Sequence, residues 1–122
     1  MVVREACARA TPEALAELER NVNETAAAQA AGDFPLRAEK NLEFHRILAR
    51  MTGNPIMVLV MNGVLDVLRE FIRSIGEYPN THVLPSRRRF IHHLKAGDAA
   101  AAQAEMEASL KRLQRSYLSK LK

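Results

Sequence analysis

The chain has 122 residues, of which 48% are apolar and 26% are charged, and its net charge is +4. This composition is typical of one globular domain and excludes a disordered chain. A single cysteine, Cys7, excludes a disulfide framework, a cysteine-based zinc site and a CxxC redox pair, as expected of a cytoplasmic protein. Charged residues interrupt the longest apolar stretch, 56–75, which predicts a buried helix and no membrane span.

The first half of the chain predicts a helical stub and two full helices. Residues 2–10 have the pattern of a helix end without a start. Thr11 and Pro12 form an N-cap followed by a proline at the first helical position, so a helix should run to about residue 31 and end at Gly32. Asp33 and a second proline start the next helix, which should end at Gly53. The two buried faces are predicted to hold Leu15, Leu18, Val22 and Ala26, then Phe44, Ile47, Leu48 and Met51.

The third helix is unusual because it is apolar on more than one side. Asn54 and Pro55 repeat the cap-plus-proline pattern, and the helix should run to about residues 74–76. A helix that is apolar nearly all round lies at the centre of a fold or between two subunits. One side holds Met57, Met61, Val64, Leu68, Phe71 and Ile75, and Ile56, Val60 and Val67 flank it.

Two helices complete the chain after a loop over 76–84. The first is predicted from about Pro85 to Ala96, with Phe90, Ile91 and Leu94 facing inward. Gly97 and Asp98 separate it from the last helix, which runs to about residue 119. No segment alternates in the manner of a strand. The sequence therefore predicts one all-α domain over 1–122, an antiparallel bundle of five helices plus a stub. The last buried face is predicted to hold Ala102, Met106, Leu110, Leu113 and Tyr117.

Polar residues fall on the inward faces of three of these helices. Asn41 and His45 lie four residues apart at the edge of one buried face. Arg87 precedes Phe90 by three residues, so it falls on the inward face of its helix. Ser109 follows Met106 by three residues and precedes Leu113 by four, so it falls on the inward face of the last helix. A bundle core that receives polar groups from several helices is a place where such proteins bind ligands or metals.

Each of these four residues also has a purely structural interpretation. A serine in an alanine-rich helix usually bonds back to its own helix, as Ser109 would. Arg87 would be exposed beside two further arginines, 88 and 89, and His45 would be satisfied by Asn41. The basic residues at 87–89 and near the C-terminus are interpreted as solvated helix faces, because aromatic residues do not alternate with them as a nucleic-acid stacking surface requires.

Three segments in sequence resemble the FCD effector-binding domain of GntR-type transcription regulators of the FadR-like group. They are the helix turn over 8–18, the run Asn41-Leu42-Glu43-Phe44-His45 followed by Gly53-Asn54, and the region from Phe90 through Gly97-Asp98 to Leu110. The resemblance implies an all-helical bundle that dimerises. It also implies a small organic acid or acyl-type effector in the core, often beside a divalent metal.

The implied metal ligands are one aspartate and three histidines, and their positions are occupied here by Asn41, His45, Arg87 and Ser109. Only His45 is retained. A neutral amide and a hydroxyl are poor ligands, and a guanidinium cannot be one. We therefore expect no metal or other cofactor, with zinc or nickel at His45 as the alternative. The hypothesis is a metal-free site in which Arg87 holds an anion, and His45, Asn41 and Ser109 donate or accept hydrogen bonds.

The resemblance covers the effector domain and not the winged helix-turn-helix domain of the family. The chain is therefore expected to be an N-terminally truncated part of a regulator that does not bind DNA directly. It is also expected to contact no membrane. It should form a homodimer through the helix from Pro55 or the helix from Thr11. Two alternatives are a dimer module without a ligand and a helical-bundle hydrolase with His45 as base. No nucleophile–base pair or phosphate-binding loop supports an enzyme.

Overall fold

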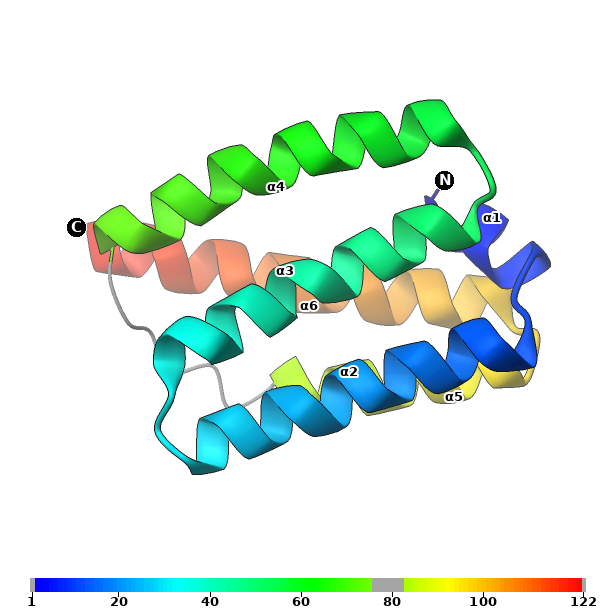
Figure 1. Cartoon of the computed structure of the whole chain (residues 1–122), viewed down its shortest axis with the longest axis horizontal. Helices are drawn as coiled ribbons and strands as arrows, with labels where there is room; N and C mark the ends of the chain where they lie inside the picture. The colour runs from blue at the N-terminus through cyan, green and yellow to red at the C-terminus, as the bar shows by residue number, and fades with distance from the viewer. Residues whose placement is uncertain (1, 76–82, 122) are drawn as a thin grey trace.

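The computed structural model describes residues 2–75 and 83–121, which form six helices and no strand (Figure 1). In chain order they are α1 (Val2–Ala8), α2 (Pro12–Ala30), α3 (Phe34–Met51), α4 (Pro55–Ile75), α5 (Val83–Lys95) and α6 (Ala99–Leu121). The predicted all-α fold is confirmed. Most of the predicted loop over 76–84 lies outside the described residues, and α5 begins two residues earlier than predicted.

Short polar side chains start three of the helices at the predicted places. Thr11, Asp33 and Asn54 each accept a hydrogen bond from a backbone N–H two or three residues further along the chain. These bonds satisfy amide groups that the first turn of a helix leaves unpaired. The connections that precede them contain Gly32 and Gly53, whose φ angles of 72° and 67° are in the left-handed region that favours glycine.

Five helices contribute side chains to the core, and α4 packs on its outside. α2 packs against α3 and α5, and α5 packs against α6. The short α1 lies against both α3 and α6 at one end of the bundle, whereas α4 runs along the outer side of α3 (Figure 1). At this end of the bundle, α1 therefore bridges α3 and α6. Further along, side chains of α3 and α6 face each other across the space between the two helices.

The core lies between α2, α3, α5 and the start of α6. The predicted inward residues of α3 and α5 are buried. Of those predicted for α2, Leu18 and Val22 are buried, whereas Leu15 and Ala26 are only half-buried. Phe44 and Phe90 meet edge to face with ring centres 6.0 Å apart, and neither ring is more than 1% exposed. The core residues are Val3, Ala6, Leu18, Val22, Phe44, Ile47, Leu48, Met51, Phe90, Ile91, Leu94 and Ala102.

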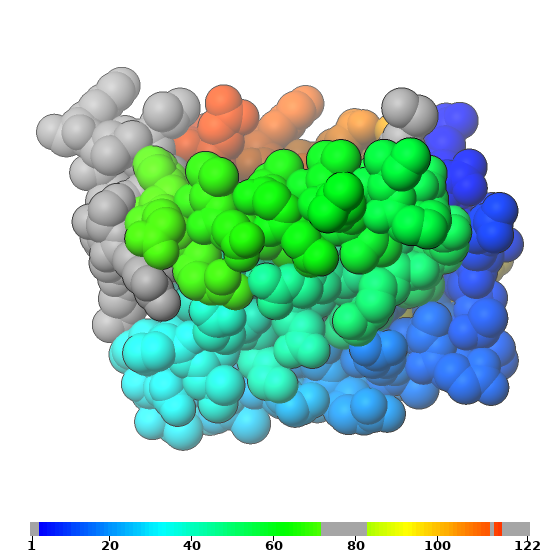
Figure 2. All heavy atoms as spheres, turned by 45° about the horizontal axis from the view of Figure 1, so that its top comes forward, coloured from blue at the N-terminus to red at the C-terminus, as the bar shows by residue number. Residues whose placement is uncertain are grey.

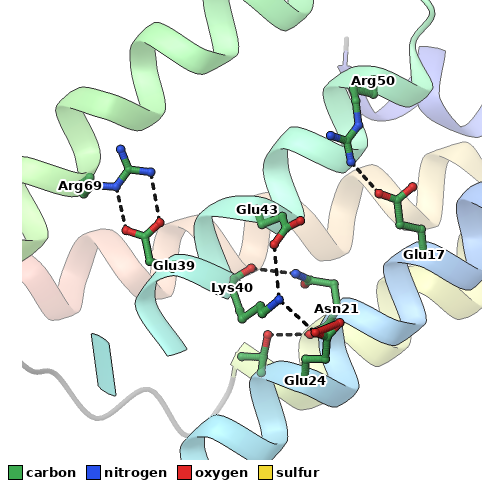
Figure 3. A network of polar contacts seen from close by, with 9 residues as sticks. Glu17, Asn21, Glu24, Glu39, Lys40, Glu43, Arg50 and Arg69 are labelled. Carbon is green, nitrogen blue, oxygen red and sulfur yellow. Dashed lines mark hydrogen bonds and ion pairs between the residues drawn. The ribbon is translucent and has the colours of Figure 1, made fainter. Parts of the chain in front are cut away.

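Polar contacts fix α3 against α2 and α4 (Figure 3). On the α2 side, Lys40 binds Glu24 with its Nζ 3.0 Å from Oε2, and the side-chain amide of Asn21 donates to the Lys40 carbonyl. On the α4 side, the Arg69 guanidinium binds both carboxylate oxygens of Glu39, at 2.8 and 3.1 Å. The two-pronged pair sets the register of α4 on α3.

α4 is not central in the fold, which corrects one of the two interpretations of its sequence. Of its described side chains only Leu65 is buried, at 1% exposure. Figure 2 shows α4 as a ridge along one face of the molecule, with its outer side uncovered. Gly63 lies on that side, with no atom near the place where a Cβ would stand. The other interpretation, a helix between two subunits, is consistent with the apolar side chains that α4 exposes: Ile56, Leu59, Val60, Val64, Val67 and Phe71.

The predicted buried face of α6 is only partly correct. Ala102 is fully buried and Met106 packs against the core. Leu110 was predicted to face inward, but 49% of it is exposed because α6 projects beyond the core at this point. The side chains of Leu113 and Tyr117 lie outside the described part of the chain.

Candidate functional site

Arg87 is buried in the bundle, where α5 begins to pack against α3. Its side chain is only 8% exposed. Its Nη1 donates a hydrogen bond of 2.9 Å to Oδ1 of Asn41, and its Nη2 donates one of 3.4 Å to the Asn41 carbonyl. The guanidinium carbon lies 4.3 Å from the centre of the Phe44 ring, a favourable cation–π distance. The structural interpretation of Arg87 as an exposed arginine is therefore wrong.

The positive charge of Arg87 has no negative partner among the described residues. Both of its hydrogen-bond acceptors are neutral oxygens of Asn41. Burial lowers the pKa of the guanidinium to about 10, so it remains protonated near neutral pH. A buried charge without a counter-charge is unfavourable, and proteins normally pair such a group.

His45 faces the same region as a neutral group. Burial, and secondly the charge of Arg87, lower its pKa to about 3. A neutral imidazole offers one donor and one acceptor nitrogen. Asn41 lies one turn away on α3, but its side-chain oxygen accepts from Arg87. Within the described part of the chain, no hydrogen bond satisfies His45.

Ser109 reaches the site from α6. It is 9% exposed, and its hydroxyl makes no hydrogen bond to any described residue. The bond back to its own helix, which would have explained a serine here, is not formed. Ser109 therefore adds a hydroxyl without a protein partner to the imidazole of His45 and the guanidinium of Arg87.

These groups meet in a cavity between α3, α5 and α6. The centre of a water molecule could occupy about 10 Å³ of it, which is room for about one water molecule. Including its opening to solvent, the space between the lining side chains is about 290 Å³. Three of the four predicted site residues line it, and Asn41 lies behind Arg87. The lining residues are His45, Ser86, Arg87, Phe90, Met106, Ser109 and Leu110.

Glu105, one turn before Ser109 on α6, is a neighbour of the site that sequence analysis missed. Its carboxylate accepts a 2.7 Å hydrogen bond from the Ser86 hydroxyl and a 2.8 Å bond from Nε of Arg89. The Arg89 bond is the main cause that lowers the Glu105 pKa, and Arg112 adds a smaller effect. The only sequence signal was the four-residue spacing from Glu105 to Ser109. The carboxylate nearest the cavity on α6 is thus already paired with cations other than Arg87.

Comparison with known families identifies the domain. The sequence model of the FCD domain matches residues 1–112. The chain belongs to the FCD domain family. FCD domains are regulatory effector-binding domains of GntR-type transcription regulators, a family that is not enzymatic.

A solved structure shows the same fold as this FCD domain. "Streptococcus agalactiae GntR" superposes with a TM-score of 0.80 at 24% sequence identity. The match covers 94% of this chain and 51% of the other, so the chain spans about half the length of that protein. No curated protein matches the chain at a significant level. No described helix is long and apolar enough to cross a membrane.

The described residues of the site do not fit a divalent metal. Among the residues that the structure describes, no three His, Cys, Asp or Glu side chains lie close enough together to hold one. At the site the available donors are a neutral imidazole, a hydroxyl and an amide oxygen, and the amide oxygen is bound to Arg87. The guanidinium also places a positive charge among these donors, which would repel a second cation.

Proposed function

We propose that this FCD domain senses a small anionic metabolite, which binds in the cavity between α3, α5 and α6. The observation that carries the proposal is the buried guanidinium of Arg87, which no described carboxylate neutralises. A carboxylate or phosphate on the ligand would supply the missing charge and pair with the planar guanidinium. No metal or cofactor is part of this proposal, and this part of the protein is proposed to act in the cytoplasm without contacting DNA itself.

The other groups of the cavity suit the same ligand. The Ser109 hydroxyl and one nitrogen of the neutral His45 ring can donate hydrogen bonds toward an anion held by Arg87. Both lack a described protein partner, so binding would not break a hydrogen bond within the protein. Phe90, Met106 and Leu110 supply an apolar wall for the remainder of a small organic acid.

Entry of such a ligand requires the cavity to widen. The part of the cavity that is closed off from solvent takes about one water molecule, which is smaller than a carboxylate with its substituent. Two flexible apolar side chains, Met106 and Leu110, line it, and Leu110 is 49% exposed. We propose that these two side chains move aside when the ligand enters, because methionine is flexible and Leu110 already lies half in solvent.

The test is a thermal-melt screen of small carboxylates and phosphate esters against the wild-type protein and Arg87→Met. A ligand at a hundredfold over its Kd should stabilise the wild type by about 2.7 kcal/mol. Arg87→Met should abolish the response, because it removes the charge and keeps the length of the side chain. The matched control is Arg88→Met at the next residue of α5, which removes an exposed arginine that donates a hydrogen bond to Asn23 of α2. Equal responses from Arg87→Met and the wild type would refute the proposal.

We also propose that the domain forms a homodimer through α4. The side chains that support this are more than half exposed over about three turns: Ile56 71%, Leu59 72%, Val60 56%, Val64 55% and Val67 73%, with Phe71 at 37% one turn further on. Monomeric proteins rarely leave a continuous apolar stripe of this kind in water. Gly63 lies within the stripe and leaves room for a second helix to cross closely. A dimer without a ligand, the purely structural alternative, would use the same face.

Sedimentation velocity or light scattering tests the dimer. Val67→Asp places a charge at the most exposed position of the stripe and should give a monomer, because an unpaired buried carboxylate strongly disfavours association. Ala27→Asp is the control, since it adds the same charge on the exposed side of α2, away from α4. A wild-type protein that is monomeric at high concentration, or a Val67→Asp protein that remains dimeric, would contradict the proposal.

A further inference from the structure

Asn41 touches the site in a different way from the other predicted residues. It does not line the cavity. Instead its Oδ1 and its backbone carbonyl receive both terminal nitrogens of Arg87, at 2.9 and 3.4 Å. The Phe44 ring supports the guanidinium on its face, 4.3 Å away. The guanidinium is therefore held from behind, and its direction is fixed before any ligand arrives.

The chemistry of the Asn41 side chain decides what this contact does to the charge. An aspartate with its Oδ1 in the same place would form a close ion pair with Arg87, and the charge would be compensated within the protein. An amide oxygen accepts the same hydrogen bond but carries no net charge. Asn41 thus orients the guanidinium and leaves its full positive charge uncompensated.

The charge of the cavity can then be counted from its walls. Arg87 is the one charged group among the described lining residues, since His45 is neutral at physiological pH. Glu105 lies close to Ser86, but Arg89 and Arg112 already pair with it. The cavity therefore offers a single positive charge, which one negative charge on a ligand would balance.

We infer that Asn41 is a positioning residue that sets the charge of the ligand, and that the cavity selects a singly charged carboxylate over neutral and doubly charged molecules of the same shape. This inference rests on the proposed function, because it assumes that the cavity binds an anion. A neutral analogue leaves Arg87 uncompensated. A doubly charged one brings a second negative charge that no described lining residue meets.

Three probes of nearly identical shape test the charge count by calorimetry: malonate, its half-amide malonamate, and malonamide, at a pH where both malonate carboxylates are ionised. In the wild type, malonamate should bind at least about tenfold more tightly than either of the others, which corresponds to about 1.4 kcal/mol. In Asn41→Asp the order should shift by one charge, so that malonamide binds at least as well as malonamate. Without a ligand, Asn41→Asp should melt no lower than the wild type, because its new ion pair completes the charge balance.

A second variant keeps the test decisive if Asn41→Asp folds poorly. Asn41→Ala removes the support of Arg87 but keeps the charge of the cavity, so it should bind malonamate more weakly while preserving the wild-type order. The inference is overturned if malonate or malonamide binds the wild type as well as malonamate does, if none of the three binds it, or if Asn41→Asp retains the wild-type order. A failure of the proposed function looks different, because there Arg87→Met and the wild type respond alike to the whole screen of carboxylates and phosphates.

Discussion

Acid should destabilise this domain well above the pH at which carboxylates titrate, and His45 is the reason. Burial, with a smaller contribution from Arg87, lowers the pKa of His45 from 6.5 to about 3. Below pH 6.5 the unfolded chain takes up a proton at this residue, whereas the folded protein does not until about pH 3. Stability is therefore lost as the pH falls through this window, by about 1.4 kcal/mol per unit. From about pH 7.5 to about pH 5 the loss is about 2 kcal/mol.

Urea unfolding of the wild type and His45→Gln at the two ends of this range measures the effect. The buffer should contain no small carboxylate, since one could bind at Arg87. His45→Gln has no titrating group at position 45, so it should lose about 2 kcal/mol less than the wild type does. Glu105 does not confuse the comparison. Its pKa is lowered from 4.5, mainly by Arg89, so its contribution is lost only at lower pH. Equal losses in the two proteins would refute a neutral His45 with a lowered pKa in the folded protein.

Further substitutions at Leu65, Gly53 and Thr11, two of them with a matched control, test how the helices are held, all by urea unfolding. Leu65→Ala should cost about 2–5 kcal/mol, because Leu65 is the buried anchor of α4, and a cost below about 1 kcal/mol would contradict that role. Gly53→Ala should cost about 1–2 kcal/mol, since φ is 67° there and the new Cβ would stand 3.1 Å from Nη1 of Arg9. The helical Gly63→Ala should not destabilise, and equal costs at the two glycines would be inconsistent with this reasoning. Thr11→Ala should cost about 1 kcal/mol through loss of the α2 cap, and Thr11→Ser should restore most of it.

The helices were predictable because their signals are local. Thr11, Asp33 and Asn54 are caps whose effect depends on the next few residues, and the apolar spacing of α3 marks its buried face without knowledge of its neighbours. The position of α4 was not predictable in the same way. Its sequence is apolar on several sides, and such a pattern is equally consistent with a core helix and with an interface. Only the packing of α4, which lies mainly against α3 and leaves its outer side exposed, distinguishes the two.

The site shows the same division between local and non-local information. Spacing placed Asn41, His45, Arg87 and Ser109 on inward faces, and the structure brings all four to one region. It did not predict that Asn41 would bind Arg87 and not His45, because that contact joins residues 46 positions apart. Ser86 and Glu105 were missed for a similar reason. Each looks like an ordinary surface residue until α5 and α6 pack and their side chains meet at 2.7 Å.

A bound anion would act on His45 as well as on Arg87, and the relative size of the two causes decides how. Burial is the larger cause of the low His45 pKa, and the charge of Arg87 is the smaller one. An anion paired with Arg87 would offset the smaller cause and leave the imidazole in a drier place than before. His45 should therefore stay neutral near physiological pH when a ligand is bound, and meet it as a hydrogen-bonding group. The charge that attracts the ligand then belongs to Arg87 alone. Because the Asn41 amide holds Arg87 without neutralising it, that full charge remains available to the ligand.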